Sequence, residues 1–248
     1  MLENHELDEL IKKLRDMRLP VMADELDQIS RSSTLGQMQI FDVLKTLIDE
    51  EYSSRKNNTI HRLIKKANFS EPKARLINLR PDPEREINLN VLGQLMTNQY
   101  IRTSRNVTIF GATGSGKSFI ANALGVHACE AGHTVRYTRM IELLFELEMS
   151  RVEGTYSKLI KLLAKTDLLI IDDFLLNSTT PNEQRDLMEV MEYRSRSKST
   201  ILCTQMDTEE WHRKLGGGAI ADAILDRVLS KTYTLLLKGD SMRAKVEN

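Results

Sequence analysis

The stretch GATGSGKS, residues 111–118, constrains the fold of this chain more than any other feature. It satisfies the pattern G-x-x-x-x-G-K-[ST], whose glycines let the backbone curl so that successive N–H groups face one point. The apolar run NVTIF precedes it and the apolar-periodic stretch KSFIANALGVHACEAG follows it. This order predicts a strand, a tight loop and a helix whose N-terminus attracts phosphate, and it disfavours a bare glycine-rich turn. We therefore predict nucleotide contacts at Gly111, Ala112, Thr113, Gly114, Ser115, Gly116, Lys117, Ser118 and Phe119.

Charged and hydroxyl side chains at this loop and at one later strand predict phosphate chemistry. Lys117 can reach the β- and γ-phosphates, and the Ser118 hydroxyl can ligate Mg²⁺. The apolar run DLLIIDDF ends in two adjacent carboxylates. We predict that Asp172 holds Mg²⁺ through water and that Asp173 polarises the attacking water. An ordinary strand-to-loop boundary also ends in aspartate, but the position downstream of a phosphate loop favours the catalytic interpretation.

Five short β-type runs predict the architecture of the second part of the chain. They are NVTIF, HTVRYT, DLLIID, STILCT and TYTLLL, separated mostly by helical stretches. Strands that alternate with crossover helices predict an α/β fold with a mainly parallel five-stranded sheet in a three-layer sandwich.

Two polar residues near the ends of predicted elements are further candidates. Gln205 follows the fourth β-type run, where it is either a sensor beside the γ-phosphate or an ordinary polar strand end. Arg227 follows the apolar helical stripe of Ile220, Ala223 and Ile224, so we expect it at a helix end, projecting outward. There it could reach a neighbour's γ-phosphate as a trans-acting finger, or form a surface salt bridge.

Residues 1–80 are predicted to form an all-helical domain whose charge changes sign. Apolar stripes within residues 7–14, 22–29 and 40–48 predict helices, with a break at Leu19-Pro20. Residues 1–51 carry twelve acidic and six basic side chains, whereas residues 55–80 carry eight basic ones and one acid. Arg55, Arg62 and Lys66 share one face of the predicted basic helix, which is either a solvated face or a surface for DNA phosphates.

The prolines of PDPERE predict a linker over residues 81–105, which also leads into the nucleotide pocket, and residues 106–248 are predicted to form the α/β domain.

Acidic and basic side chains balance at 35 each, so net charge says nothing about partners. The sequence contains no apolar run of about 20 residues and begins without a secretory signal, so we expect a cytoplasmic protein without membrane contact. Cys129 and Cys203 lack metal-ligand spacing and are predicted to be buried thiols, and Trp211 a core residue.

Taken together, these segments resemble the IstB family, the AAA+ ATPase helpers of two-gene insertion sequences, and more distantly the DnaC helicase loaders. The matching stretches are MRLPVMADELDQ, DEEYSSRKNNTIHRLIKKANF, GATGSGKS, LLIIDDF, STILCTQM with the following EEWH, and AILDRVLS through GDSMR. They cover essentially the whole chain in the family's order. The LPxMA element and the basic helix are specific to this family, whereas the phosphate-loop and aspartate motifs alone indicate only a P-loop ATPase.

The resemblance implies roles for particular residues. Lys117 and Ser118 would bind ATP and Mg²⁺, and Asp172 would be the metal acid. Asp173 occupies the place usually held by a catalytic glutamate; since its side chain is one methylene shorter, we expect slow or stimulated hydrolysis. The remaining correspondences are Gln205 with the sensor-I asparagine, Arg227 with the arginine finger and Arg243 with a second sensor. Because the chain ends soon after its last strand, we expect no helical lid.

The resemblance also implies a function. The chain would form homo-oligomers on duplex DNA with ATP, select or present target DNA, and stimulate an IstA-type transposase, with hydrolysis driving disassembly. The implied DNA contacts are Arg55, Arg62, Lys65 and Lys66 on the N-terminal side, and Arg151 and Lys158 beside the insertion between the second and third strands. A helicase loader is the alternative. A small-molecule phosphotransferase is a third reading, for which YRSRSKS, residues 193–199, would be the arginine-rich loop.

Overall fold

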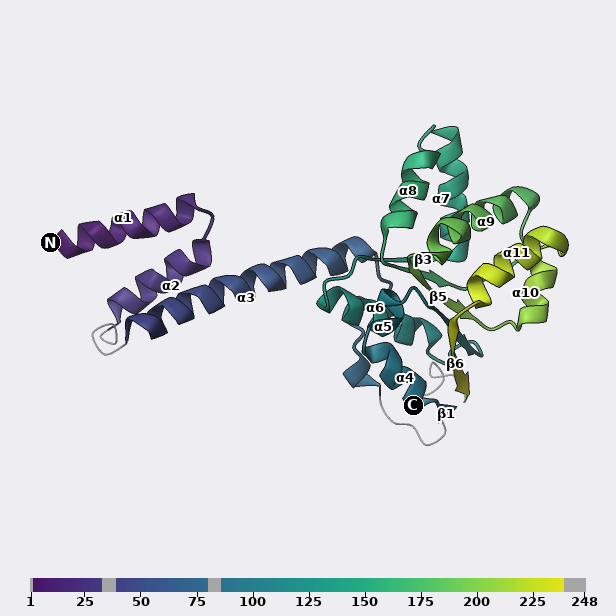
Figure 1. Cartoon of the computed structure of the whole chain (residues 1–248), viewed down its shortest axis with the longest axis horizontal. Helices are drawn as coiled ribbons and strands as arrows, with labels where there is room; N and C mark the ends of the chain where they lie inside the picture. The colour runs from purple at the N-terminus through teal and green to yellow at the C-terminus, as the bar shows by residue number, and fades with distance from the viewer. Residues whose placement is uncertain (1, 33–38, 80–85, 239–248) are drawn as a thin grey trace. The chain divides into compact units, whose positions relative to one another are not determined.

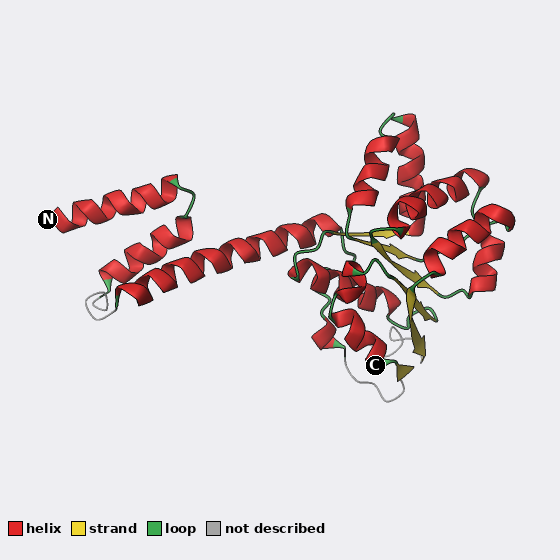
Figure 2. Ribbon diagram, in the orientation of Figure 1, coloured by secondary structure: helices red, strands yellow, loops and turns green. Residues whose placement is uncertain are grey.

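The computed structural model describes residues 2–32, 39–79 and 86–238 of the chain, so the predicted second sensor, Arg243, lies outside the described residues. The chain divides into two compact units, Met1–Arg62 and Leu63–Asn248. Figure 1 labels most of their helices and strands, and Figure 2 distinguishes helix from strand. In the described residues, no helix is both long enough and apolar enough to cross a membrane.

The first unit is helical, as the apolar stripes predict. It contains α1 (Leu2–Asp16), α2 (Pro20–Arg31) and most of α3 (Ile40–Ala67). The third apolar stripe and the basic run belong to one continuous helix, α3.

Glu51 of α3 lies buried at the start of α2. Its carboxylate accepts the backbone N–H groups of Val21 and Met22 at 2.9 and 3.1 Å. Pro20 stands at the first position of α2, where a missing N–H costs no hydrogen bond. The buried acid thus satisfies N–H groups that the helix itself leaves unpaired, which explains why the LPVMA segment starts a helix here.

The second unit is built on a sheet with strand order β1-β6-β2-β5-β4-β3. The five predicted runs form β2 (Asn106–Gly111), β3 (Val135–Arg139), β4 (Leu168–Asp172), β5 (Ser199–Thr204) and β6 (Thr232–Lys238). All of these pair in parallel, which confirms the mainly parallel α/β prediction. The short strand β1 (Glu86–Ile87) adds an antiparallel edge to β6. The helices are α4 (Leu89–Met96), α5 (Gln99–Arg102), α6 (Lys117–Glu130), α7 (Met140–Val152), α8 (Tyr156–Lys165), α9 (Pro181–Ser195), α10 (Thr208–Lys214) and α11 (Gly218–Leu229), with a 3-10 turn at Leu76–Asn78.

Helices cover both faces of this sheet (Figure 2). The side chains of β4 show the division, because Leu168 and Ile170 belong to the core beneath α6, whereas Leu169 and Ile171 belong to the core beneath α7, α9 and α11. This alternation confirms the three-layer sandwich. Helices α4 and α5, inside the predicted linker, contribute buried side chains to the first core.

The two cysteines and the tryptophan are core residues, as predicted. Cys129 and Cys203 are free thiols buried in the first core. Burial raises the pKa of Cys129 to about 12, so this thiol stays protonated near neutral pH. Trp211 is fully buried in the second core, stacked on Phe110 and edge-on to Phe174.

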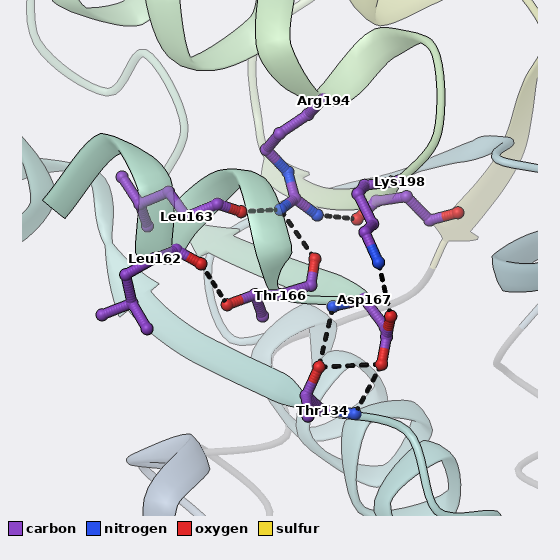
Figure 3. Close-up of polar contacts among 8 residues, drawn as sticks. Thr134, Leu162, Leu163, Thr166, Asp167, Arg194 and Lys198 are labelled. Carbon is purple, nitrogen blue, oxygen red and sulfur yellow. Dashed lines mark hydrogen bonds and ion pairs between the residues drawn. The ribbon is translucent and has the colours of Figure 1, made fainter. Parts of the chain in front are cut away.

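The interpretation of residues 193–199 as an arginine-rich loop is wrong. Helix α9 continues through Ser195, and Arg194 is only 1% exposed. Its guanidinium donates hydrogen bonds to the carbonyl oxygens of Leu163, Thr166 and Ser199, as Figure 3 shows for this cluster. Helix periodicity carries this arginine inward, where it ties α8, α9 and β5 together instead of covering a substrate.

Candidate nucleotide-binding site

The predicted phosphate loop connects β2 to α6, and its glycines are required by geometry. Gly114 and Gly116 have φ values of 79° and 88°, a region that glycine enters without steric cost. At Gly111 the reason is packing, since a Cβ atom there would lie 2.5 Å from Ser115 Oγ and 2.9 Å from the carbonyl oxygen of Leu237. The loop therefore curls tightly around the start of α6.

Lys117 is held inside this curl. Its side chain is largely buried, and Nζ donates hydrogen bonds to the carbonyl oxygens of Gly111 and Ala112 at 2.9 and 2.8 Å. The ammonium group thus lies against the loop, beside the N-terminus of α6. A phosphate placed here would meet both the lysine charge and the positive end of the helix dipole.

A cavity of about 240 Å³ opens in front of the loop. Since one water molecule occupies about 30 Å³ in the liquid, this volume accommodates a phosphoryl group with several waters. The lining residues come from the loop, from the ends of β3 and β5, and from the segments that follow β4 and β5: Thr113, Gly114, Lys117, Ser118, Arg139, Asp173, Phe174, Leu176, Thr204 and Gln205. The fold thus brings six predicted residues to one cavity: Thr113, Gly114, Lys117, Ser118, Asp173 and Gln205.

The two adjacent carboxylates at the end of β4 have different environments. Asp172 is 3% exposed and accepts hydrogen bonds from the Tyr137 hydroxyl at 2.7 Å and from the Asp173 backbone N–H at 2.9 Å. Asp173 has a φ of 53°, a left-handed conformation that aspartate tolerates better than most residues. This turn leaves the Asp173 side chain 43% exposed and lining the cavity.

Arg139 is a cavity residue that the sequence reasoning missed. It ends β3, in register with Asp172 on the neighbouring strand. Its Nε lies 3.3 Å from an oxygen of Asp173, and its guanidinium also lies 3.9 Å from Glu142. The available signal was its position directly after the run HTVRYT, at the strand end where ligand-binding residues of parallel sheets collect. Asp173 is thus paired with an arginine of its own chain at the edge of the cavity.

Gln205 connects the end of β5 to the phosphate loop. Its Oε1 accepts a hydrogen bond from the Thr113 hydroxyl at 2.7 Å. The neighbouring Thr204 hydroxyl donates to the carbonyl oxygen of Phe174 and accepts from Trp211 Nε1, both at 3.1 Å. The buried tryptophan thus supports the strand end that presents Gln205.

The residues present fit a magnesium nucleotide. Within the described ranges, His, Cys, Asp and Glu side chains form no group of three or more that could hold a metal by themselves. The candidate ligands are the Ser118 hydroxyl, which lines the cavity, and the buried carboxylate of Asp172, which directly precedes the lining residue Asp173. Such an oxygen-only set, completed by phosphate oxygens and water, suits Mg²⁺, which keeps several waters when it binds with nucleotide.

Arg227 and Arg55 have partners within their own units. Arg227 lies in the last turn of α11, forms an ion pair with Glu192, and donates a hydrogen bond to the Ala223 carbonyl at 2.8 Å. Arg55 pairs with Glu51 at 2.7 Å and also donates to the carbonyl oxygen of Arg18. The finger role of Arg227 and the DNA contact of Arg55 remain predictions, and each would require the side chain to leave these partners.

The other predicted DNA-binding residues differ in how free they are. Arg62, Lys65 and Lys66 are exposed on α3, and Lys158 is exposed on α8. Arg151 instead stacks at 3.8 Å over the ring of Tyr156 and pairs with Asp186. The exposed lysines and Arg62 are therefore better placed to meet a phosphate backbone than Arg151.

Comparison with known proteins places this chain in a family. The profile described as IstB-like ATP binding protein matches residues 12–248. A protein of Sinorhizobium fredii, whose name describes an insertion sequence ATP-binding protein, is 34% identical over 230 residues, which is 93% of this chain and 92% of the relative. The corresponding protein of insertion sequence IS21 from Pseudomonas aeruginosa is 26% identical over 241 residues, covering 97% of this chain and 89% of that protein.

Solved structures share the fold. The crystal structure of the DnaC helicase loader superimposes with a TM-score of 0.55 at 20% identity, covering 66% of this chain and 97% of that one. The replication initiator DnaA, bound to AMPPCP and single-stranded DNA, gives a TM-score of 0.56 at 20% identity, covering 72% of this chain and 54% of that one. At these identities the likeness shows the fold alone.

Proposed function

Since the chain belongs to the IstB-like ATP-binding protein family, we propose that it hydrolyses ATP to ADP and phosphate in the service of insertion-sequence transposition. The observation that carries the proposal is the cavity that unites Lys117, Ser118, Asp173 and Gln205 beside the buried carboxylate of Asp172. Nucleotide-binding chemistry needs a cationic loop, a metal acid and a polarising carboxylate in reach of one phosphate, and these groups line or border one cavity.

Each residue would have a defined task. The N–H groups of the loop and Lys117 hold the β- and γ-phosphates, and Ser118 and Asp172 hold Mg²⁺, the latter through water. When bound, Mg²⁺ neutralises charge on the phosphates. Asp173 orients a water and takes its proton as the water oxygen bonds to the γ-phosphorus and the bond to the bridging oxygen of ADP breaks. Gln205 donates its side-chain amide to the γ-phosphate.

The same proposal includes assembly on DNA and action on a partner transposase. It is supported by the insertion-sequence names of the relatives and by the exposed basic residues Arg62, Lys65 and Lys66 of α3. The affinity of such a face for duplex DNA would fall steeply as the salt concentration rises, because counterions are released on binding. Arg227 of one protomer would complete the site of its neighbour.

The first test is nucleotide binding by Lys117→Ala, measured by titration of a fluorescent ATP analogue. We expect binding to be abolished, since the variant lacks the one side-chain cation that the loop encloses. Lys161→Ala, an exposed lysine of α8, is the matched control and should bind as the wild type does. Unaltered binding by Lys117→Ala would remove the phosphate assignment.

The second test measures the ATPase rate with and without duplex DNA, and the affinity for DNA with ATP against ADP. We expect DNA to raise the rate and ATP to raise the affinity. If neither ligand affects the other, the DNA-linked function is refuted even if ATP is hydrolysed.

A helicase loader is the alternative function, favoured by a fold likeness that spans 97% of the DnaC chain. The two functions differ in the partner protein on which the ATPase acts. Retention of a replicative helicase, in place of a transposase, in a pull-down would favour the alternative.

A further inference from the structure

Tyr137 is placed to orient the metal acid of the site. It lies on β3, and its hydroxyl donates to the carboxylate of Asp172 across the two strands. Both residues are at least 95% buried. A carboxylate in such surroundings holds its hydrogen-bond donors strongly, because few water molecules compete for it. With the Asp173 N–H on its other oxygen, each oxygen of Asp172 has a donor, and the Cys203 thiol also interacts with this carboxylate. A carboxylate has about four acceptor sites, so one remains for a metal-bound water.

Tyr137 is in turn connected to the segment that leaves helix α3. Burial raises the pKa of the Tyr137 phenol above its ordinary range, and the Ser70 hydroxyl, which interacts with it, acts in the opposite direction. Asn122 of α6, fully buried, donates from Nδ2 to Ser70 Oγ at 3.0 Å and to the Ser118 carbonyl at 2.7 Å. Asn122 therefore connects Ser70 to the first turns of the phosphate-loop helix.

A close contact beside Ser70 fixes this segment on α6. Phe69 lies 91% buried in the first core. A Cβ atom at Gly125 of α6 would come within 2.5 Å of the Phe69 ring, so the ring occupies the space that the glycine leaves. In addition, the Glu71 backbone N–H donates to Asn122 Oδ1 at 3.3 Å. The segment 69–71 is thus attached to α6 by an apolar contact and by hydrogen bonds on both sides of the Asn122 amide.

We propose that Tyr137 is a positioning residue for the metal acid Asp172. The inference rests on the proposed function, because it takes Asp172 as the residue that holds Mg²⁺ through water. Partners that orient metal ligands from behind typically change metal affinity or activity 10- to 100-fold when they are removed.

The main test is Tyr137→Phe, which keeps the buried ring and removes only the donor to Asp172. The affinity of a non-hydrolysable ATP analogue is measured with Mg²⁺ and with EDTA. We expect the gain in affinity that Mg²⁺ provides to fall about tenfold, while the affinity in EDTA changes less than twofold. A purely structural role would lower both affinities together. An unchanged Mg²⁺ gain would overturn the proposal.

Tyr100→Phe is the matched control. Tyr100 is 1% exposed, and its hydroxyl meets no hydrogen-bond partner among the residues that the structure describes. Its removal therefore deletes a buried phenol oxygen without touching Asp172, and the Mg²⁺ gain should equal that of the wild type. A tenfold loss in this variant as well would show that the assay reports general packing, and the proposal would fail.

Failure of the proposed function is distinguishable: a wild type with a Mg²⁺ gain but without hydrolysis refutes the ATPase alone.

Discussion

Replacement of Gly125 by alanine should destabilise the second unit, although the same change stabilises most helices. Gly125 lies within α6, where alanine is favoured over glycine by about 1 kcal/mol. An added Cβ atom would, however, lie 2.5 Å from one ring carbon of Phe69, 3.0 Å from another, and 2.7 Å from the Cδ1 atom of Ile170. The sign of the effect depends on whether these neighbours can move.

The Ile170 contact is with a terminal methyl group, which can rotate away. The Phe69 ring presents two atoms, and its neighbours Ser70 and Glu71 are hydrogen-bonded to Asn122, so it cannot shift as a unit at low cost. Overpacking of this kind costs about 1–3 kcal/mol. Against the gain of about 1 kcal/mol, we expect a net loss of about 1 kcal/mol, which corresponds to a fall of about 2–4 °C in Tm for a unit of this size.

The assay is thermal unfolding followed by tryptophan fluorescence. Trp211 is the single tryptophan and is fully buried in the second unit, so the signal reports on that unit. Gly93→Ala is the control, because Gly93 lies in α4 with nothing within 4 Å of the added Cβ atom. It should raise Tm by about 2–4 °C. If both variants are stabilised alike, the Phe69 ring does not rest on Gly125.

Three further outcomes follow from the polar contacts. Arg194→Met should lower the free energy of unfolding by about 3 kcal/mol, because the carbonyl acceptors around a 1% exposed guanidinium lose their donor. Chemical denaturation measures this free energy, and a change below about 1 kcal/mol would contradict the role of Arg194 in joining α8, α9 and β5. Burial alone would raise the pKa of Asp167, but hydrogen-bond donors from Lys198 and Thr134 outweigh burial and lower it. The stability that ionised Asp167 contributes is therefore present above about pH 4 and is lost as pH falls further. The difference in Tm between wild type and Asp167→Asn should be constant from pH 5 to 8 and shrink below pH 4. Arg227→Ala should keep ATP-analogue affinity and lower hydrolysis about 10³-fold, whereas Glu192→Gln, which only frees the arginine, should not; full hydrolysis by a strictly monomeric preparation would exclude the finger.

The architecture of the second unit could be predicted because its signals are local. Strands β4 and β5 are buried along their whole length, and β4 forms an apolar run that is visible without knowledge of its neighbours. The phosphate loop is equally local, since its glycines, lysine and serine are adjacent in sequence. For the same reason, Asp172 and Asp173 could be placed at a strand end.

The missed residues depend on which elements become neighbours. Arg139 and Tyr137 approach the two aspartates only because β3 pairs with β4, and a strand run carries no information on its partner. Glu51 stood in an acidic stretch and could not be distinguished from exposed acids, although it is buried against the start of α2. The change of charge after residue 51 suggested separate segments, whereas the helix continues because neither proline nor glycine interrupts residues 40–67.

Two ion pairs indicate how the proposed hydrolysis could be slow in an isolated chain and still be easily started. Asp173 is paired with Arg139, and Arg227 with Glu192, so both charged groups on which the reaction would depend have partners within the same chain. The side chains of Asp173 and Arg227 are 43% and 25% exposed, and ion pairs at a surface contribute about 0–1 kcal/mol. A triphosphate offers a guanidinium several anionic oxygens in place of one carboxylate, so it competes with Asp173 for Arg139 and with Glu192 for Arg227. The pairs therefore do not oppose assembly, and the rate would be set by how often a neighbour brings its Arg227 to the phosphate beside Asp173.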